Sequence, residues 1–368
     1  MINSLVFPLT LQGSLLWKGN AITQLRLKAA VIRLDSSNHL GRLTSLSLTT
    51  TRPSADKLVM TVDAWHSLQG LTTLRAPTCI RINSETLPLL LGLTLLEELS
   101  VLGLDKLPRR RHLSEQGAAM LVPQGLPRLR FLAYDECCYP EALIDFLSWT
   151  GPGFQNFGEP PNANCGHHTK TTAVAIEHLS FRLNRNGPEL ESFRRLIDAG
   201  STPLLISRVS GLDLEMASDA GLENFGHAPA VDDILPSFLS SLAGTLQVLS
   251  MKGFHISTSY ASRLAEALPG LCRVMMDECW LMPGSLNGLH SLRGLSHVEL
   301  TSCLGSGMRP TFLLSFAANS LKPLHLHVAV GLYAGGEEEY VSDEMNEVAE
   351  LLRSLRPEAY FCWDWFEN

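Results

Sequence analysis

Cysteine and histidine side chains are the first residues of this sequence that could do chemistry. Cys165, His167 and His168 lie close together, and His325 and His327 alternate as two ligands on one face of a strand would. Nitrogen and sulfur ligands at such spacings suit zinc, which is usually bound by four ligands in a tetrahedron. A zinc site then needs a second ligand pair at a suitable spacing, and neither group has one. We interpret both groups as loop or surface residues and predict neither a metal nor another cofactor.

The motifs that mark common catalytic sites are missing from the sequence. It contains no Gly-rich phosphate loop, no H-E-x-x-H and no G-x-S-x-G. Cys137 and Cys138 are adjacent, and a disulfide between them would be strained. An enzyme would need a deep pocket lined by acid and base groups, for example beside the segment 165–168. We predict that the protein is not an enzyme.

Composition and charge argue against several classes of protein. The 368 residues are 45% hydrophobic and carry a formal net charge of −8, which disfavours nucleic-acid binding through clustered Lys and Arg. The apolar run 87–96 is too short to span a bilayer, and the first cation, Lys18, comes too late for the charged start of a signal peptide. The eight cysteines lack the spacing of a small disulfide-bonded domain. These features predict a cytoplasmic protein, with a nuclear one as the alternative, that binds neither nucleic acid nor membranes.

One apolar pattern recurs three times between Leu246 and Cys303. Each copy reads apolar-x-x-apolar-x-apolar and is followed three residues later by Cys or an apolar residue. The copies start at Leu246, Leu271 and Leu295, so they are 25 and 24 residues apart (271−246 and 295−271). Apolar residues at the fourth and sixth positions place both side chains on the same face of a strand. A lone strand cannot bury that face, but stacked neighbours can.

The same pattern extends over most of the chain. Segments between the expected strands show helical spacing over residues 55–68, 84–93, 140–149 and 343–355. Residues 151–172 are rich in Gly, Pro and Asn and are interpreted as an insertion. We expect an N-terminal cap or truncated repeat over 1–21, a repeat array over 22–333, and a C-terminal capping helix and tail over 334–368. The further repeats start at Ile22, Leu43, Leu71, Leu96, Leu129, Ile176, Val209 and Leu321.

Half of the cysteines fall at one position of the repeat, the ninth. A residue there turns inward, where a thiol packs as a small hydrophobic group and can donate weakly to the backbone of the turn. We predict a structural role for these thiols in the core rather than a redox or metal-binding role. They are Cys79, Cys137, Cys279 and Cys303.

On these repeats the chain resembles the leucine-rich-repeat superfamily over about residues 22–329. Its helix-bearing repeats and ninth-position cysteines are similar to the ribonuclease-inhibitor-like and cysteine-containing subclasses, the latter as in F-box substrate receptors of ubiquitin ligases. The resemblance implies an α/β leucine-rich-repeat solenoid, a curved horseshoe with a parallel sheet on the concave side and helices on the convex side. It also implies a non-enzymatic scaffold that binds a protein or peptide partner. The alternative is the substrate-recognition subunit of an F-box-type ligase, although no F-box is recognisable ahead of Ile22.

The strand positions between the buried leucines should face the concave side, where a partner would bind. They carry basic residues in the first repeats and acidic residues in later ones, so a basic partner segment would be attracted to the acidic portion. Two of these positions are apolar, as interface anchors often are. The alternatives are that exposed strand positions are simply polar, and that a slipped register places the apolar pair in the core. The predicted partner-binding residues are basic Arg26, Lys28 and Arg75, apolar Phe131 and Met275, and acidic Asp135, Glu136, Asp213, Glu215, Asp277, Glu278 and Glu299.

Overall fold

Two compact units make up the chain in the computed structural model. One comprises Met1–Phe181 and Leu204–Arg208, and the other comprises Arg182–Pro203 and Val209–Asn368. The structure describes residues 4–8, 23–34, 40–55, 58–107, 125–137, 142–150, 176–183, 208–216, 239–240, 242–320, 324–331 and 338–366. The predicted insertion, with its Cys165, His167 and His168, and the repeat starts Ile22 and Leu321 lie outside these residues.

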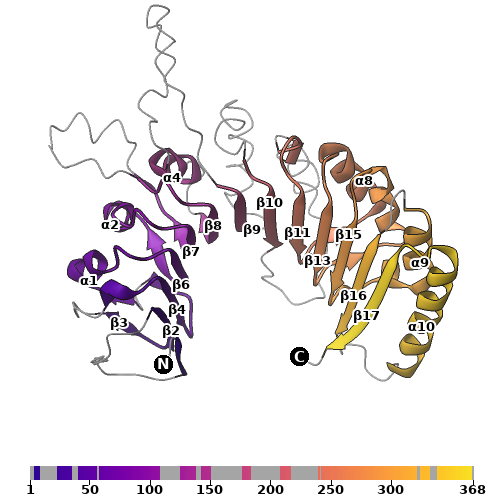
Figure 1. Ribbon diagram of the computed structural model, residues 1–368, viewed down its shortest axis with the longest axis horizontal. Helices are drawn as coiled ribbons and strands as arrows, with labels where there is room; N and C mark the ends of the chain where they lie inside the picture. Colours follow the sequence, from indigo (N-terminus) through magenta and orange to yellow (C-terminus); the bar gives the residue numbers. More distant parts are fainter. Residues whose placement is uncertain are drawn as a thin grey trace, which may run out of the picture. The chain divides into compact units, whose positions relative to one another are not determined.

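The first unit is built on parallel strands that follow one another across a sheet (Figure 1). In order they are β1 (Ser4–Pro8), β2 (Gln24–Ala29), β4 (Ser45–Thr50), β6 (Thr73–Ile82), β7 (Glu98–Leu104), β8 (Phe131–Cys137) and β9 (His178–Leu183), whose last two residues belong to the second unit. The helices α1 (Val62–Ser67), α2 (Thr86–Leu91) and α4 (Ala142–Thr150) lie on one side of these strands. A separate parallel ladder joins β3 (Ile32–Leu34) to β5 (Leu58–Met60).

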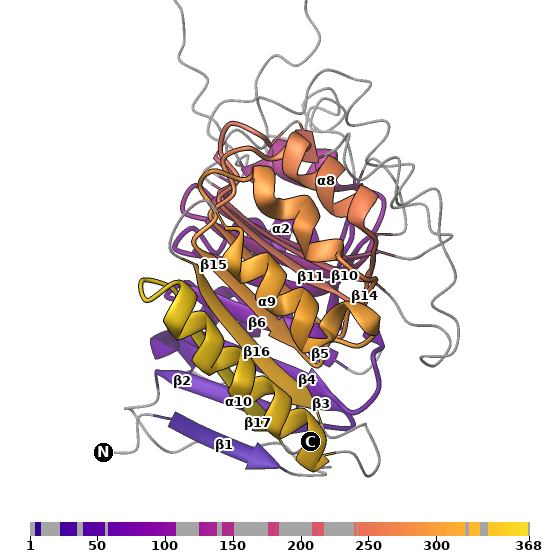
Figure 2. The same cartoon turned by 90° about the vertical axis from the view of Figure 1, so that its right-hand side faces the viewer.

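The second unit repeats this arrangement. Its parallel strands are β10 (Gly211–Met216), β11 (Val248–Lys252), β13 (Arg273–Asp277), β15 (His297–Thr301), β16 (His325–Gly331) and β17 (Tyr360–Phe366). The helices α8 (Thr258–Ala267), α9 (Pro310–Ala318) and α10 (Glu338–Leu355) lie together on one face of these strands (Figure 2). Short 3-10 turns η4 (Ser285–Ser291) and η5 (Ser306–Met308) and a small ladder of β12 (His255–Ile256) with β14 (Trp280–Leu281) complete the helical side.

Rows of apolar side chains run across each stack of strands and form its core. Strand register places each residue beside its counterpart one repeat away. Because each layer shields the next from water, the stack buries side chains that no single repeat could bury. The fold is an α/β leucine-rich-repeat solenoid, as the spacing predicted. The following row members are all at most 4% exposed: Leu25, Leu46, Leu74, Leu99, Leu132 and Leu179 in the first unit, and Leu212, Leu249, Val274, Val298 and Leu326 in the second.

The ninth-position cysteines that the structure describes with their side chains are core residues. Cys79, Cys279 and Cys303 are free and buried, and each thiol donates to a backbone carbonyl of the preceding repeat. The acceptors are the carbonyls of Leu48, Met251 and Met276, at sulfur–oxygen distances of 3.8, 3.3 and 3.3 Å. Burial raises the pKa of the Cys79 thiol from 9.0 to about 11, so that this donor stays protonated in mildly alkaline solution as well. The side chain of Cys137 lies outside the described part of the chain.

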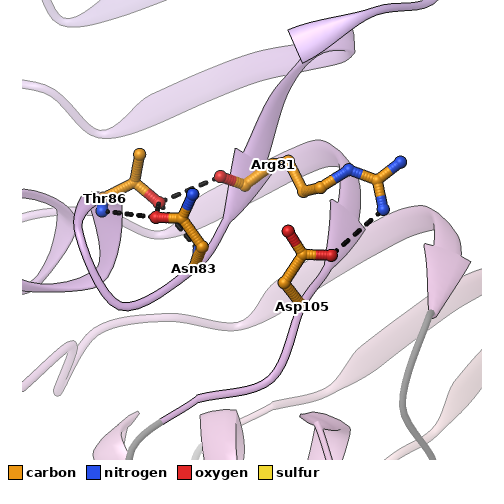
Figure 3. Close-up of polar contacts among 4 residues, drawn as sticks. All are labelled: Arg81, Asn83, Thr86 and Asp105. Carbon is orange, nitrogen blue, oxygen red and sulfur yellow. Dashed lines mark hydrogen bonds and ion pairs between the residues drawn. The ribbon is translucent and has the colours of Figure 1, made fainter.

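Polar contacts at the start of α2 show how a repeat turns from strand to helix (Figure 3). Asn83 Oδ1 accepts from the N–H groups of Glu85 and Thr86, both at 2.9 Å, and Thr86 Oγ1 donates to the Arg81 carbonyl at 2.9 Å. These bonds satisfy N–H groups that have no partner inside a helix. Arg81 Nη1 also lies 3.2 Å from Asp105 Oδ1 of the next repeat. The helix predicted over 84–93 is present but shorter, at Thr86–Leu91, and the Asn83 side chain fixes its start.

Two other predicted helices have different bounds in the structure. The prediction over 55–68 is wrong in its first half, because Leu58–Met60 form β5 and pair with β3. Helix α1 begins after Thr61, whose Oγ1 accepts from the Ala64 N–H at 3.2 Å. The helix predicted over 343–355 starts earlier, at Glu338, and ends at Leu355 as predicted. The predicted C-terminal tail forms β17, which pairs in parallel with β16.

Candidate protein-binding face

Side chains that alternate with the buried rows lie on the face of each sheet away from the helices, which we call the open face. In the part of the chain that the structure describes, the helices of each unit gather on the other face (Figures 1 and 2). Along β13 the side chains are in turn exposed, buried, half-buried, buried and half-buried. This period of two gives each strand two or three residues with which to meet a partner.

The basic residues predicted to bind a partner lie on the open face of the first unit. Arg26 and Lys28 are exposed on β2, and Arg75 is exposed on β6. Arg75 Nε lies 2.6 Å from Glu98 Oε1 on the neighbouring strand β7. Arg75 therefore has an acidic neighbour that lowers its local positive charge, while Arg26 and Lys28 present theirs to solvent.

Strand β8 carries three more of the predicted residues. Phe131 is half-buried on the open face and stacks on His178 of β9, with ring centroids 4.9 Å apart and planes at 16°. Asp135 is half-buried on the same strand, and Glu136 follows it with a side chain outside the described part. The register does not slip at Phe131, because its neighbour Leu132 occupies the buried row.

The first acidic residues of the second unit lie on β10. Asp213 and Glu215 are half-buried on its open face. Glu215 Oε1 lies 3.8 Å from Arg182 Nε, and the two side chains are 44% and 40% exposed. Such an exposed pair contributes little to stability, so both groups stay available to a partner at small cost.

A lysine lies beside the acidic residues Asp277 and Glu278. Lys252 Nζ on β11 lies 3.5 Å from Asp277 Oδ2 and 3.4 Å from Glu278 Oε1, the residue after β13. Burial acts to lower the pKa of Lys252, but Glu278, Asp277 and Glu215 outweigh it and raise that pKa above 10.5. Burial raises the pKa of Asp277, while Lys252 opposes the change. Sequence reasoning missed this cation because Lys252 lies one repeat before Asp277, and only the pairing of β11 with β13 brings the two side chains together.

The remaining predicted residues lie side by side on β13 and β15. Met275 is half-buried on the open face, and its register neighbours are Ser250 on β11 and Glu299 on β15. Glu299 is also half-buried. Met275 is therefore outside the core, and it forms an apolar spot between polar neighbours.

A row that sequence reasoning did not predict crosses four neighbouring strands. Strand register aligns Arg273, His297, His325 and Tyr360. Arg273 Nη2 lies 3.1 Å from His297 Nε2, and the rings of His297 and His325 meet edge to face with centroids 4.5 Å apart. The rings of His325 and Tyr360 meet in the same way, again at 4.5 Å. The signal in the sequence was that all four residues precede the first apolar residue of their strands.

Glu299 joins this row to a third histidine. Its two carboxylate oxygens lie 3.9 Å from His297 Nε2 and 3.9 Å from His327 Nδ1. Burial lowers the pKa of His297, with Arg273 and His325 adding to the effect. Since a guanidinium can only donate, the neutral His297 ring accepts at Nε2. We call the six residues the histidine patch: Arg273, His297, Glu299, His325, His327 and Tyr360.

Two further findings concern only the described residues. They contain no group of three or more His, Cys, Asp or Glu side chains placed to hold a metal ion, and His325 and His327 lie in different rows of the patch. Among the helices of the same residues, none combines the length and apolar character needed to cross a membrane.

Known proteins offer distant structural similarity to the chain. No protein-family model matches it, and no curated protein matches it. Among solved structures, an internalin of Listeria monocytogenes str. 4b F2365 is 14% identical with a TM-score of 0.28, over 81% of this chain and 86% of that one. A TDR receptor is 15% identical with a TM-score of 0.29, over 84% and 48% of the two chains. TLR13 in its complex with ssRNA13 is 12% identical with a TM-score of 0.29, over 85% and 50%.

Proposed function

We propose that the chain is a non-enzymatic scaffold that binds a protein partner on its open face. A basic segment of that partner would lie over the acidic residues of the second unit, above all Asp213, Glu215 and Glu278. The observation that carries the proposal is Met275, half-buried among polar side chains of three parallel strands. An apolar centre with a charged rim is the usual composition of a protein interface.

A photo-crosslinking experiment tests which face binds. A photoreactive phenylalanine analogue would replace Met275 on the open face or Glu266, which is exposed on α8. We expect a partner adduct from the Met275 position, which mass spectrometry would identify, and none from the Glu266 position. Adducts from the Glu266 position alone would place the binding site on the helical side and would refute the proposal.

We propose the cytoplasm, with the nucleus as the alternative, as the place of this interaction. The five cysteines that the structure describes as free thiols support a reducing compartment. The buried thiols of Cys79, Cys279 and Cys303 also support the resemblance to cysteine-containing repeats, and thereby the alternative role in an F-box-type ligase. Co-purification of the chain with the ligase adaptor would favour that alternative, and its failure would leave the simple scaffold.

A further inference from the structure

Arg273 brings more hydrogen-bond donors to the histidine patch than its neighbours there accept. Arg273 has five N–H donors, of which the structure directs one at His297 Nε2. The three imidazoles and the Tyr360 hydroxyl add further donors, whereas Glu299 is the one carboxylate of the patch. A group with several acceptor oxygens would complement this surplus.

One ring nitrogen of the patch is unpaired within the described part of the chain. His325 Nε2 is buried, and no hydrogen-bond partner for it exists among the described residues. An unpaired buried polar atom is costly, and it is uncommon outside functional sites. Two rings pack against His325, and one of them belongs to Tyr360, which is 59% exposed. A small movement of that exposed side chain would bring Nε2 within reach of a bound oxygen.

Resting on the proposed function, we infer that the histidine patch is a docking subsite for a carboxylate of the protein partner, supplied by an Asp or Glu side chain in an acidic segment. Arg273 would bind the carboxylate through its free N–H groups, because guanidinium–carboxylate pairs are strong and directional. Tyr360 would pack against the partner backbone, since Tyr and Arg are the residue types most often found at energetic centres of interfaces. The basic segment and this acidic residue would then occupy neighbouring parts of the same face.

The charges around the patch favour a single carboxylate over a polyanion. Arg273 is the one permanent cation of the patch, and Glu299 lies between two of its histidines. Asp277 and Glu278 lie on or next to the same strand as Arg273. A nucleic acid or polyphosphate would be repelled by these groups and by the net charge of −8.

Acidification should strengthen this interaction. A bound carboxylate would stabilise the imidazolium form of His297, so binding is linked to proton uptake. Burial of His297 and the neighbouring Arg273 and His325 lower the pKa of His297 and so oppose that uptake in the unbound protein. The affinity therefore rises as the pH falls from 8 to 6, while the Asp or Glu of the partner stays ionised. The other charged or titratable residues on the same side of the neighbouring strands, among those with described side chains, are Lys252, Asp277 and Cys362. Asp364 of β17 pairs in register with Ala329.

Nuclear magnetic resonance on the full chain with isotopically labelled histidine tests the inference. The probes are a capped tetra-aspartate peptide and its tetra-asparagine counterpart, each titrated at pH 6.0 and 8.0. We expect tetra-aspartate to bind about tenfold more tightly than tetra-asparagine at pH 6.0, to shift the His297 and His325 resonances, and to weaken at pH 8.0. Arg273→Ala should lower the affinity about tenfold, whereas Arg293→Ala, which removes an exposed arginine from the turn before β15, should not.

Other outcomes would overturn the inference. Equal affinities for the two peptides, equal losses in Arg273→Ala and Arg293→Ala, or tighter binding at pH 8.0 would each do so. Tighter binding of a DNA oligonucleotide than of tetra-aspartate would show that the patch serves a polyanion. His325→Gln preserves the size and polarity of a half-buried side chain. Unchanged tetra-aspartate binding by this variant would show that the histidines are not part of the subsite. A crosslink from Met275 without tetra-aspartate binding would reject this subsite alone, whereas no crosslink from the open face would reject the proposed function.

Discussion

Replacing Leu249 by Asp should unfold the second unit around β11. Leu249 is fully buried between Leu212 of β10 and Val274 of β13. Loss of the aliphatic side chain alone costs about 2–5 kcal/mol in such a site. Burial of an unpaired carboxylate, or its protonation, adds several kcal/mol more. The sum approaches the roughly 5–15 kcal/mol that holds a typical domain together.

The neighbouring residue provides a matched control. Ser250 is half-buried on the open face of the same strand, so Ser250→Asp places the same carboxylate where water can reach it and should cost less than about 1 kcal/mol. Hydrogen–deuterium exchange read by mass spectrometry would follow peptides from β10, β11 and β13. We expect all three to lose protection together in Leu249→Asp, because each repeat is buried by its neighbours. Equal effects of the two variants, or normal protection of β13 in Leu249→Asp, would refute the stacking of these rows.

Three further predictions concern a thiol, a glycine and a charged residue. Burial raises the folded-state pKa of Cys79 from 9.0 to about 11. The contribution of this thiol to the free energy of unfolding is therefore complete below pH 9 and declines by about 3 kcal/mol as the pH rises through 11. Urea denaturation between pH 8 and 10.5 should show a steeper loss of stability in the native chain than in Cys79→Ala. Gly307→Ala should destabilise the second unit, because the new Cβ would overlap the Met282 carbonyl, whereas Gly270→Ala meets nothing closer than 3.5 Å; thermal melting should separate the two variants clearly. Asp213→Lys should change melting by less than about 0.5 kcal/mol but reduce capture of a basic partner, and unchanged capture would exclude Asp213 from the interface.

Strands were predictable because their signal is local. Leu249 and Met251 stand two residues apart in β11, and the same spacing marks each neighbouring strand of the array. Burial then follows from stacking alone, since side chains two residues apart share a face. The C-terminal strand β17 escaped prediction because its aromatic residues follow a helix and lack the leading apolar position of the repeat.

Contacts between distant residues were not predictable from spacing within a segment. Leu58–Met60 fit a helical pattern, but they pair with Ile32–Leu34 in a separate ladder. The histidine patch was hidden for a similar reason. His297 and His325 come from different repeats, and only the register of β15 with β16 brings their rings together. Lys252 reaches the carboxylate of Asp277 through the same kind of cross-strand contact.

The central claim is that alternate residues of each strand divide between a buried core and a binding face. Single cysteine substitutions at the five positions of β13, Arg273 to Asp277, test it most directly through maleimide labelling of the native chain, read by mass spectrometry of the labelled peptide. The account predicts fast labelling at positions 273, 275 and 277 and slow labelling at 274 and 276, with a bound partner slowing only the first set. Uniform labelling along the strand, or fast labelling at positions 274 and 276, would contradict it.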